Sequence, residues 1–100
     1  MYVTMNRFKI IPGNEEYFLD IWKNRDTFLD EVPGFKQFNL LRGPKTEEYC
    51  LFASHSVWES KQAFVDWTKS EAFRKAHANV GEIKPIYLDK PELETFETVL

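Results

Sequence analysis

The stretch that decides the fold opens the chain, where residues 2–16 read YVTMNRFKIIPGNEE. Residues 2–11 follow the two-residue alternation of a strand, and both faces carry apolar side chains, so we expect both faces to be covered. Pro12-Gly13 predicts a turn. Asn14, followed by two glutamates, is typical of a helix start, because asparagine can cap a helix and carboxylates favour its positive end. The chain therefore begins as strand, turn and helix.

The remaining sequence continues this succession of patterns. Helical spacing runs from Phe18 to Val32 and stops at Pro33-Gly34. Strands are expected over 35–42 and 49–57, joined in a hairpin by a turn over 43–47. Helical segments over 60–69 and 70–77, the second capped by Ser70, precede a loop over 79–91 and a last strand over 93–100.

The order strand, helix, strand, strand, helix, strand predicts one α+β domain over residues 1–100. It is typical of the ferredoxin-like split βαβ arrangement, an antiparallel sheet with both helices on one face. The other sheet face is apolar too and would be bare. Because 100 residues bury only about two-thirds of their unfolded surface, a second copy covering that face is the simplest remedy. We therefore expect a homodimer.

Composition excludes several partners. The net charge is −3, and no stretch gathers the lysines and arginines that nucleic acids require. No apolar run reaches the roughly 20 residues that span a bilayer, and the start of the chain has no signal-peptide pattern. The lone Cys50 allows no intrachain disulfide, is expected to be buried, and fits a reducing cytoplasm.

Asn6 is the first candidate site residue. It lies in mid-strand on the face that carries Thr4, Phe8 and Ile10 and that should point at the helices. A buried amide must find partners or cost a few kcal/mol. One interpretation is a hydrogen bond to nearby backbone. The other is an amide donor directed into a cavity.

His77 is the second candidate, four residues after Phe73 on the apolar side of its helical segment. It is either a satisfied structural histidine or a ligand, and neutral imidazole is the usual protein donor to haem iron. One histidine does not suffice for zinc, which takes three or four ligands. The only other histidine, His55, lies on a predicted strand without a carboxylate or cysteine set around it.

Trp67 is the third candidate, although its spacing alone fits a core tryptophan. On an unbroken helix, Trp67 and His77 would point about 80° apart, and a break at Ser70 would change this angle. Other chemistries find little support, since neither a glycine-rich phosphate loop nor a G-x-S-x-G elbow occurs. The acidic residues near this segment, Glu59, Asp66 and Glu71, fit a solvated helix face.

Several motifs along the chain carry a family resemblance. They are M-N-R-F-K (5–9), V-P-G-F (32–35), L-L-R-G-P (40–44), S-H-S-V-W-E-S (54–60) and, most densely, W-T-K-S-E-A-F-R-K-A-H (67–77). With an asparagine in the first strand, a tryptophan in the second helix and a histidine ten residues later, the chain resembles the IsdG-type haem-degrading monooxygenases. These haem oxygenases belong to the antibiotic biosynthesis monooxygenase (ABM) superfamily of dimeric α+β barrels, and the proteobacterial branch is the most similar.

The resemblance implies the following roles. His77 would be the axial ligand of haem iron, Asn6 would donate its side-chain amide toward the iron-bound oxygen or its neighbouring ligand, and Trp67 would press on the porphyrin and distort it. Apolar neighbours, Phe8, Phe64 and Phe73, would flank the ring. Haem would be both substrate and cofactor, an external reductant would supply electrons, and O2 would be consumed as the ring opens and iron is released.

Two alternatives stay open, because the fold alone does not fix the function. One is a non-catalytic dimer that stores or transfers haem, which needs His77 but neither Asn6 nor Trp67. The other is a cofactor-independent ABM oxygenase acting on a quinol-type substrate, which needs no iron ligand. The residues of 79–89 do not determine which product a haem oxygenase would release.

Overall fold

The computed structural model describes residues 1–24, 29–76 and 86–100. In chain order its elements are β1 (Tyr2–Ile10), α1 (Glu15–Asn24), the 3-10 helix η1 (Leu29–Glu31), β2 (Phe35–Lys45), β3 (Cys50–Trp58), α2 (Lys61–Thr68), α3 (Glu71–Ala76) and β4 (Glu92–Glu97). This is the predicted succession, and α2 and α3 correspond to the helical segments expected over 60–69 and 70–77. None of the described helices is long and apolar enough to span a bilayer.

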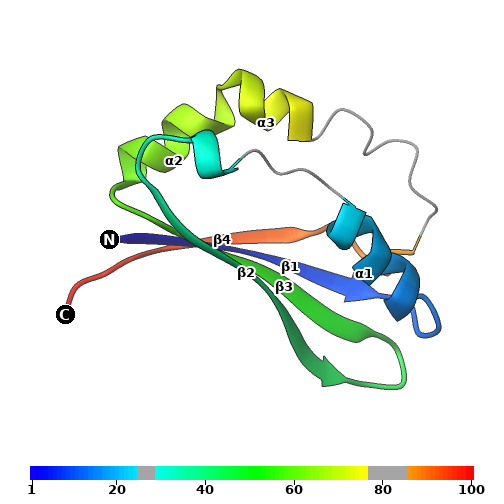
Figure 1. Ribbon diagram of the computed structural model, residues 1–100. Coiled ribbons are helices and arrows are strands. Elements are labelled where there is room, and N and C mark those ends of the chain that lie inside the picture. Colours follow the sequence, from blue (N-terminus) through cyan, green and yellow to red (C-terminus); the bar gives the residue numbers. More distant parts are fainter. Residues whose placement is uncertain (25–28, 77–85) are drawn as a thin grey trace.

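The four strands form one antiparallel sheet in the order β2-β3-β1-β4. The helices lie over one face of this sheet, with α1 at one end and α2 and α3 at the other (Figure 1). The predicted α+β, ferredoxin-like arrangement is therefore confirmed. Thr4, Phe8 and Ile10 are buried on the helix side of β1, as the alternation predicts.

The core is built where α1 meets the sheet. Phe18 of α1 is fully buried, and its ring centroid lies 4.9 Å from that of Phe52 on β3 and 5.4 Å from that of Phe8 on β1. Trp22 and Tyr87 pack against the same cluster. Each buried aromatic ring removes a large apolar area from water, so this cluster fixes α1 on the sheet.

Serine caps separate α2 from α3. The Ser60 Oγ accepts from the Ala63 N–H at 3.2 Å and begins α2. The Ser70 Oγ accepts from the Phe73 N–H at 3.1 Å and donates to the Trp67 carbonyl at 2.6 Å. One hydroxyl thus closes α2 and opens α3, which confirms the predicted cap and break at Ser70.

A close approach explains the glycine that precedes β2. Gly34 has φ of +84°, and a Cβ at this position would lie only 2.6 Å from the Ala63 Cβ of α2. Only glycine combines this left-handed backbone with so tight a contact. The glycine of the predicted Pro33-Gly34 turn therefore also allows the start of β2 to lie directly against α2.

Three boundaries differ from the prediction. The α-helix expected to reach Val32 is described as far as Asn24, and beyond the undescribed residues 25–28 the chain forms the 3-10 helix η1 instead. β2 extends to Lys45 because a bulge between Arg42 and Lys45 accommodates Gly43-Pro44, which an edge strand tolerates. β4 ends at Glu97, since this residue already faces Tyr2, the first residue of β1.

Candidate active site

Asn6 lies on the helix side of β1, between the regions that the helices cover. Its neighbours across the sheet are Ser54 on β3 and Leu93 on β4. The residue is half-buried, and its Oδ1 is fully buried without a hydrogen-bond partner. A hydrogen bond to nearby backbone, the simpler interpretation of this asparagine, is therefore not formed within the part of the chain that the structure describes.

Trp67 lies in the last turn of α2 within a second aromatic cluster. Its ring centroid is 4.9 Å from that of Phe73 in an edge-on contact and 6.1 Å from that of Phe64. These three side chains are half-buried. The break at Ser70 allows this arrangement, because α3 can fold Phe73 back against Trp67. The structure thus brings together three of the residues predicted to contact haem.

Trp58 forms the floor of this cluster, a role that the sequence did not reveal. It lies at the end of β3, is 0% exposed, and its ring centroid is 5.3 Å from that of Trp67. Its Nε1 donates to the Oγ1 of the buried Thr4 at 3.3 Å. The available signal was the alternation of β3, which puts Trp58 on the same face as Ser54 and Ser56.

Phe8 does not join the Trp67 cluster. Its ring contacts Phe18 and Trp22 of α1 and Tyr87, in the core at the other end of β1. Asn6 therefore lies between two aromatic groups, one on the α1 side and one on the α2 side. Phe8 is 6% exposed, so its described surroundings are those of a core residue.

His77, the predicted iron ligand, lies outside the described residues, directly after α3. His55 pairs with Met5 and Asn39, so it belongs to the sheet face away from the helices. Within the described residues, no group of three or more His, Cys, Asp or Glu side chains could hold a metal ion. Of the two histidines, only His55 is therefore placed by the structure, on the face away from the helices.

The acidic residues near α2 are engaged at the surface. Glu59 pairs with Lys36 at 3.0 Å, Asp66 accepts from Gln62 at 2.8 Å, and Glu71 pairs with Arg74. All three acids are exposed, as expected for a solvated face. They are therefore poor candidates for acid–base chemistry.

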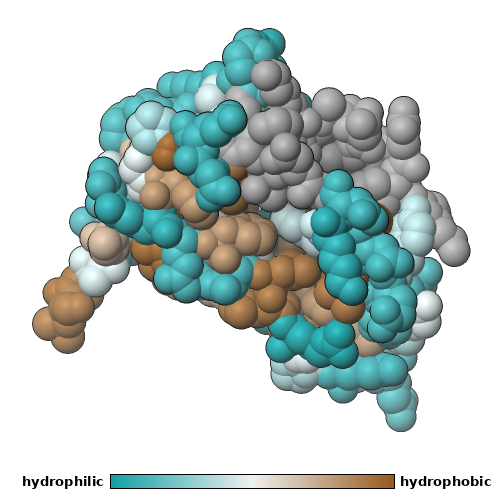
Figure 2. All heavy atoms as spheres, in the orientation of Figure 1, coloured by the Kyte–Doolittle hydropathy of each residue, from teal (hydrophilic) through white to brown (hydrophobic). Residues whose placement is uncertain are grey.

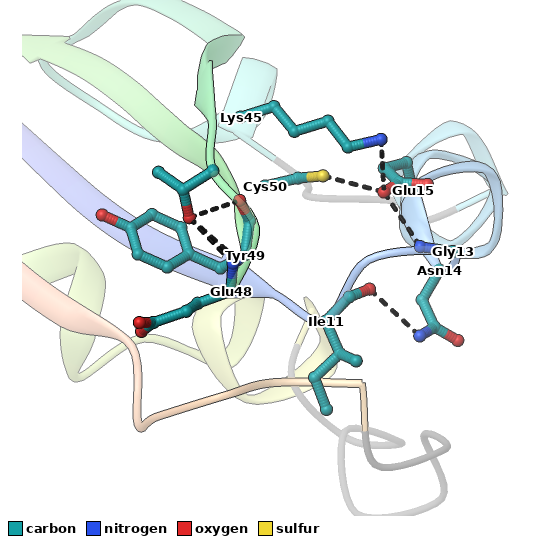
Figure 3. Close-up of polar contacts among 9 residues, drawn as sticks. Ile11, Gly13, Asn14, Glu15, Lys45, Glu48, Tyr49 and Cys50 are labelled. Atoms are coloured by element: carbon teal, nitrogen blue, oxygen red, sulfur yellow. Dashed lines mark hydrogen bonds and ion pairs between the residues drawn. The ribbon is translucent and has the colours of Figure 1, made fainter.

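A separate polar cluster lies at the far end of the β1–β3 pair, around Glu15 (Figure 3). The buried Cys50 thiol donates to Glu15 Oε1 at 2.8 Å, the Gly13 N–H donates at 3.0 Å, and the Lys45 Nζ lies 4.0 Å away. The thiol hydrogen bond is the main reason that the pKa of Glu15 falls from 4.5 to about 2. Burial raises the pKa of Cys50, so the thiol stays protonated. This cluster anchors the start of α1 to the hairpin.

A comparison with known proteins bears on this site. Residues 1–79 match the family described as antibiotic biosynthesis monooxygenase. A heme-degrading monooxygenase of Bacillus thuringiensis (strain Al Hakam) is 32% identical over 89 residues, which are 89% of this chain and 82% of that protein. A heme-degrading monooxygenase of Bacillus cereus (strain AH187) matches to the same extent.

Solved structures agree with this assignment. The heme-degrader MhuD of Mycobacterium tuberculosis, with two hemes bound in its active site, has a TM-score of 0.74 and 29% identity, over 100% of this chain and 97% of that one. SnoaB, a cofactor-independent oxygenase of Streptomyces nogalater, has a TM-score of 0.69 and 20% identity, over 97% and 91%, and supports the fold alone. The chain therefore belongs to the antibiotic biosynthesis monooxygenase family, which confirms the expectation of an oxidoreductase of the monooxygenase class.

Proposed function

We propose that this chain is a haem-degrading monooxygenase. It binds haem as substrate and cofactor, consumes O2 with electrons from an external donor, and opens the porphyrin to release iron. Relatives named for heme degradation at 32% identity and the haem-bound relative at 29% support this activity. A lone cysteine fits a reducing cytoplasm as the place of action.

The observation that carries the proposal is the buried amide oxygen of Asn6. A buried acceptor without a donor costs about 1–3 kcal/mol, and a fold keeps such a cost where a ligand or a reaction uses the group. Rotation of the amide can present either its NH2 or its oxygen to a ligand. Asn6 thus supplies an uncharged polar contact between two aromatic clusters, the surroundings that a flat apolar ring with a polar centre requires.

The aromatic side chains fit the rest of such a ligand. Trp67, Phe64 and Phe73 form a stiff group, because Trp67 packs against the fully buried Trp58. In the proposal these three side chains would contact the porphyrin, and Trp67 would press on it, which a close-packed interior can do. His77 would hold the iron. Phe8 supports the site from the core and is not in its ring wall.

The proposed active form is a homodimer. The sheet has a second face, which points away from the helices and contains an apolar depression. Five apolar residues line this depression: Met5, Leu41, Leu51, Ala53 and Phe96. Leu41 is 41% exposed and Phe96 is 48% exposed. Arg7 and Glu94 pair across this face at 3.6 Å, so it carries both charges. A two-fold pairing of this face with itself would cover the apolar residues and match the charges. Apolar surface also lies along the sheet below the helices (Figure 2).

Haemin titration in two stages tests the function. Haemin is first added under anaerobic conditions to the wild type, to His77→Ala, and to the matched control His55→Ala, which removes the histidine on the other face. Air and ascorbate are then admitted. We expect a Soret band that bleaches in the wild type and the control, and loss of both the ligated spectrum and the bleaching in His77→Ala.

The outcomes separate the alternatives. A Soret band that persists in the wild type under air and reductant indicates a haem-binding or transfer protein. Unchanged ligation and turnover in His77→Ala would remove the axial role of that residue. If haemin does not bind and a quinol is oxidised without it, the cofactor-independent alternative holds.

A further inference from the structure

Trp58 and Thr4 connect the two candidate site residues that the structure describes. Trp58 is enclosed, with ring centroids 5.6 Å from Phe35, 5.6 Å from Phe64 and 5.3 Å from Trp67. Ring contacts of this kind favour offset or edge-on arrangements, but none of them satisfies the buried indole N–H. A polar contact that satisfies it adds a further constraint on the orientation of the ring.

The indole N–H of Trp58 provides that contact. It donates to Thr4 Oγ1 at 3.3 Å, with Trp58 at 0% and Thr4 at 5% exposure. A buried donor strongly favours the one orientation that satisfies it. The Thr4 side chain is itself branched at Cβ and therefore stiff about χ1. The hydrogen bond thus locks the Trp58 ring against β1.

The same strand carries Asn6. Thr4 and Asn6 are two residues apart on β1 and face the same side of the sheet, because side chains alternate along a strand. A short series of contacts therefore joins Asn6 to Trp67. It runs along the β1 backbone to Thr4, through the hydrogen bond to Trp58, and through the ring contact to Trp67.

We propose that Trp58, held by Thr4, is a positioning residue that fixes the Trp67 indole relative to Asn6. This inference rests on the proposed function for its effect on catalysis, but the orientation of Trp67 is a property of the ligand-free protein. Thr4→Val removes the hydroxyl while nearly keeping the shape of the side chain, and Thr4→Ser keeps the hydroxyl. The difference between these two variants isolates the hydrogen bond.

The first readout needs no haem. Two indoles with centroids 5.3 Å apart give an exciton couplet in far-ultraviolet circular dichroism, whose amplitude depends on their mutual orientation. Trp67→Phe should abolish the couplet, whereas Trp22→Phe, in the other aromatic cluster, should retain it. We expect Thr4→Val to lose at least half of the amplitude and Thr4→Ser to recover most of it.

The second readout is haem turnover. We expect Thr4→Val to lower kcat about fivefold, the loss that corresponds to one net hydrogen bond, with the haem Kd changed less than twofold. Thr4→Ser should restore kcat. If Thr4→Val does not fold, Trp58→Phe, which keeps a ring and removes the N–H, should show the same split between kcat and Kd.

The outcomes are distinct. An unchanged couplet in folded Thr4→Val, or a loss in Thr4→Ser as large as in Thr4→Val, overturns the proposal. If Thr4→Val does not fold, an unchanged kcat in Trp58→Phe overturns it. A wild type that does not turn over haem contradicts the proposed function, while the couplet still tests the positioning.

Discussion

Replacing Asn6 with leucine should make the haem-free protein more stable. The amide oxygen is fully buried and accepts no hydrogen bond from the described residues, so its desolvation is uncompensated. Such a group costs about 1–3 kcal/mol, and leucine has a similar shape without it. Asn6→Leu should therefore raise the free energy of unfolding by about that amount. For a domain of this size, each kcal/mol shifts Tm by about 4–8 °C.

Urea and thermal unfolding of the haem-free protein measure this change. The matched control is Asn39→Leu on the neighbouring part of the sheet, where an exposed asparagine accepts from Gln37 at 2.7 Å. A surface change of this kind should stay within about 0.5 kcal/mol. Haem turnover should fall in Asn6→Leu, because leucine cannot make the proposed polar contact to the ligand, and it should remain in the control. At position 6 the substitution would then increase stability and decrease activity.

The reasoning is refuted if Asn6→Leu is less stable than the wild type by 1 kcal/mol or more. That result would mean that the amide has a partner outside the described residues. It would also remove the basis for assigning Asn6 to a ligand.

Three further predictions concern Gly34, the polar cluster around Glu15 and the sheet face away from the helices. Gly34→Ala should lower the free energy of unfolding by clearly more than the roughly 1–2 kcal/mol expected for Gly13→Ala. Both glycines have positive φ, but only a Cβ at position 34 would collide with α2. Equal losses of stability for the two variants in urea unfolding would contradict this. The lowered pKa of Glu15 contributes stability that is present above pH 4.5 and lost as the pH falls towards 2. Below pH 4.5 the free energy of unfolding of Glu15→Gln should therefore depend less on pH than that of the wild type. Parallel pH dependences of the two proteins would refute the role of this carboxylate. Phe96→Asp should convert the proposed dimer to a monomer in size-exclusion chromatography, while Leu93→Asp on the opposite side of β4 should not; two dimeric variants would place the interface elsewhere.

Local patterns in the sequence were sufficient for most of the fold. Alternation defined β1, and Ser70 correctly marked the start of α3, because capping depends on residues within one turn. The end of β2 was not predictable from turn residues. Gly43-Pro44 is typical of a turn. In an edge strand, which pairs with a neighbour on one side only, the same two residues can be accommodated in a bulge.

The site was predictable only in part, and for a physical reason. Position along β1 put Asn6 on the helix side. The contact between Trp67 and Phe73 does not follow from helical spacing, because the two residues lie on separate helices and meet through the break at Ser70. The separation of Phe8 from that group depends on which helix covers which end of the sheet. The hydrogen bond between Trp58 and Thr4 spans 54 positions in sequence, and no local pattern specifies such a contact.

The bulge near the end of β2 has a consequence for how copies of this protein can meet. β2 is an edge strand of the sheet, and near its end it carries Pro44, which has no backbone N–H, and the charged Lys45. The other outer strand, β4, is six residues long and carries three glutamates. Both edges of the sheet thus disfavour strand-by-strand growth into fibrils, so the proposed contact between copies would use the apolar sheet face and not the strand edges.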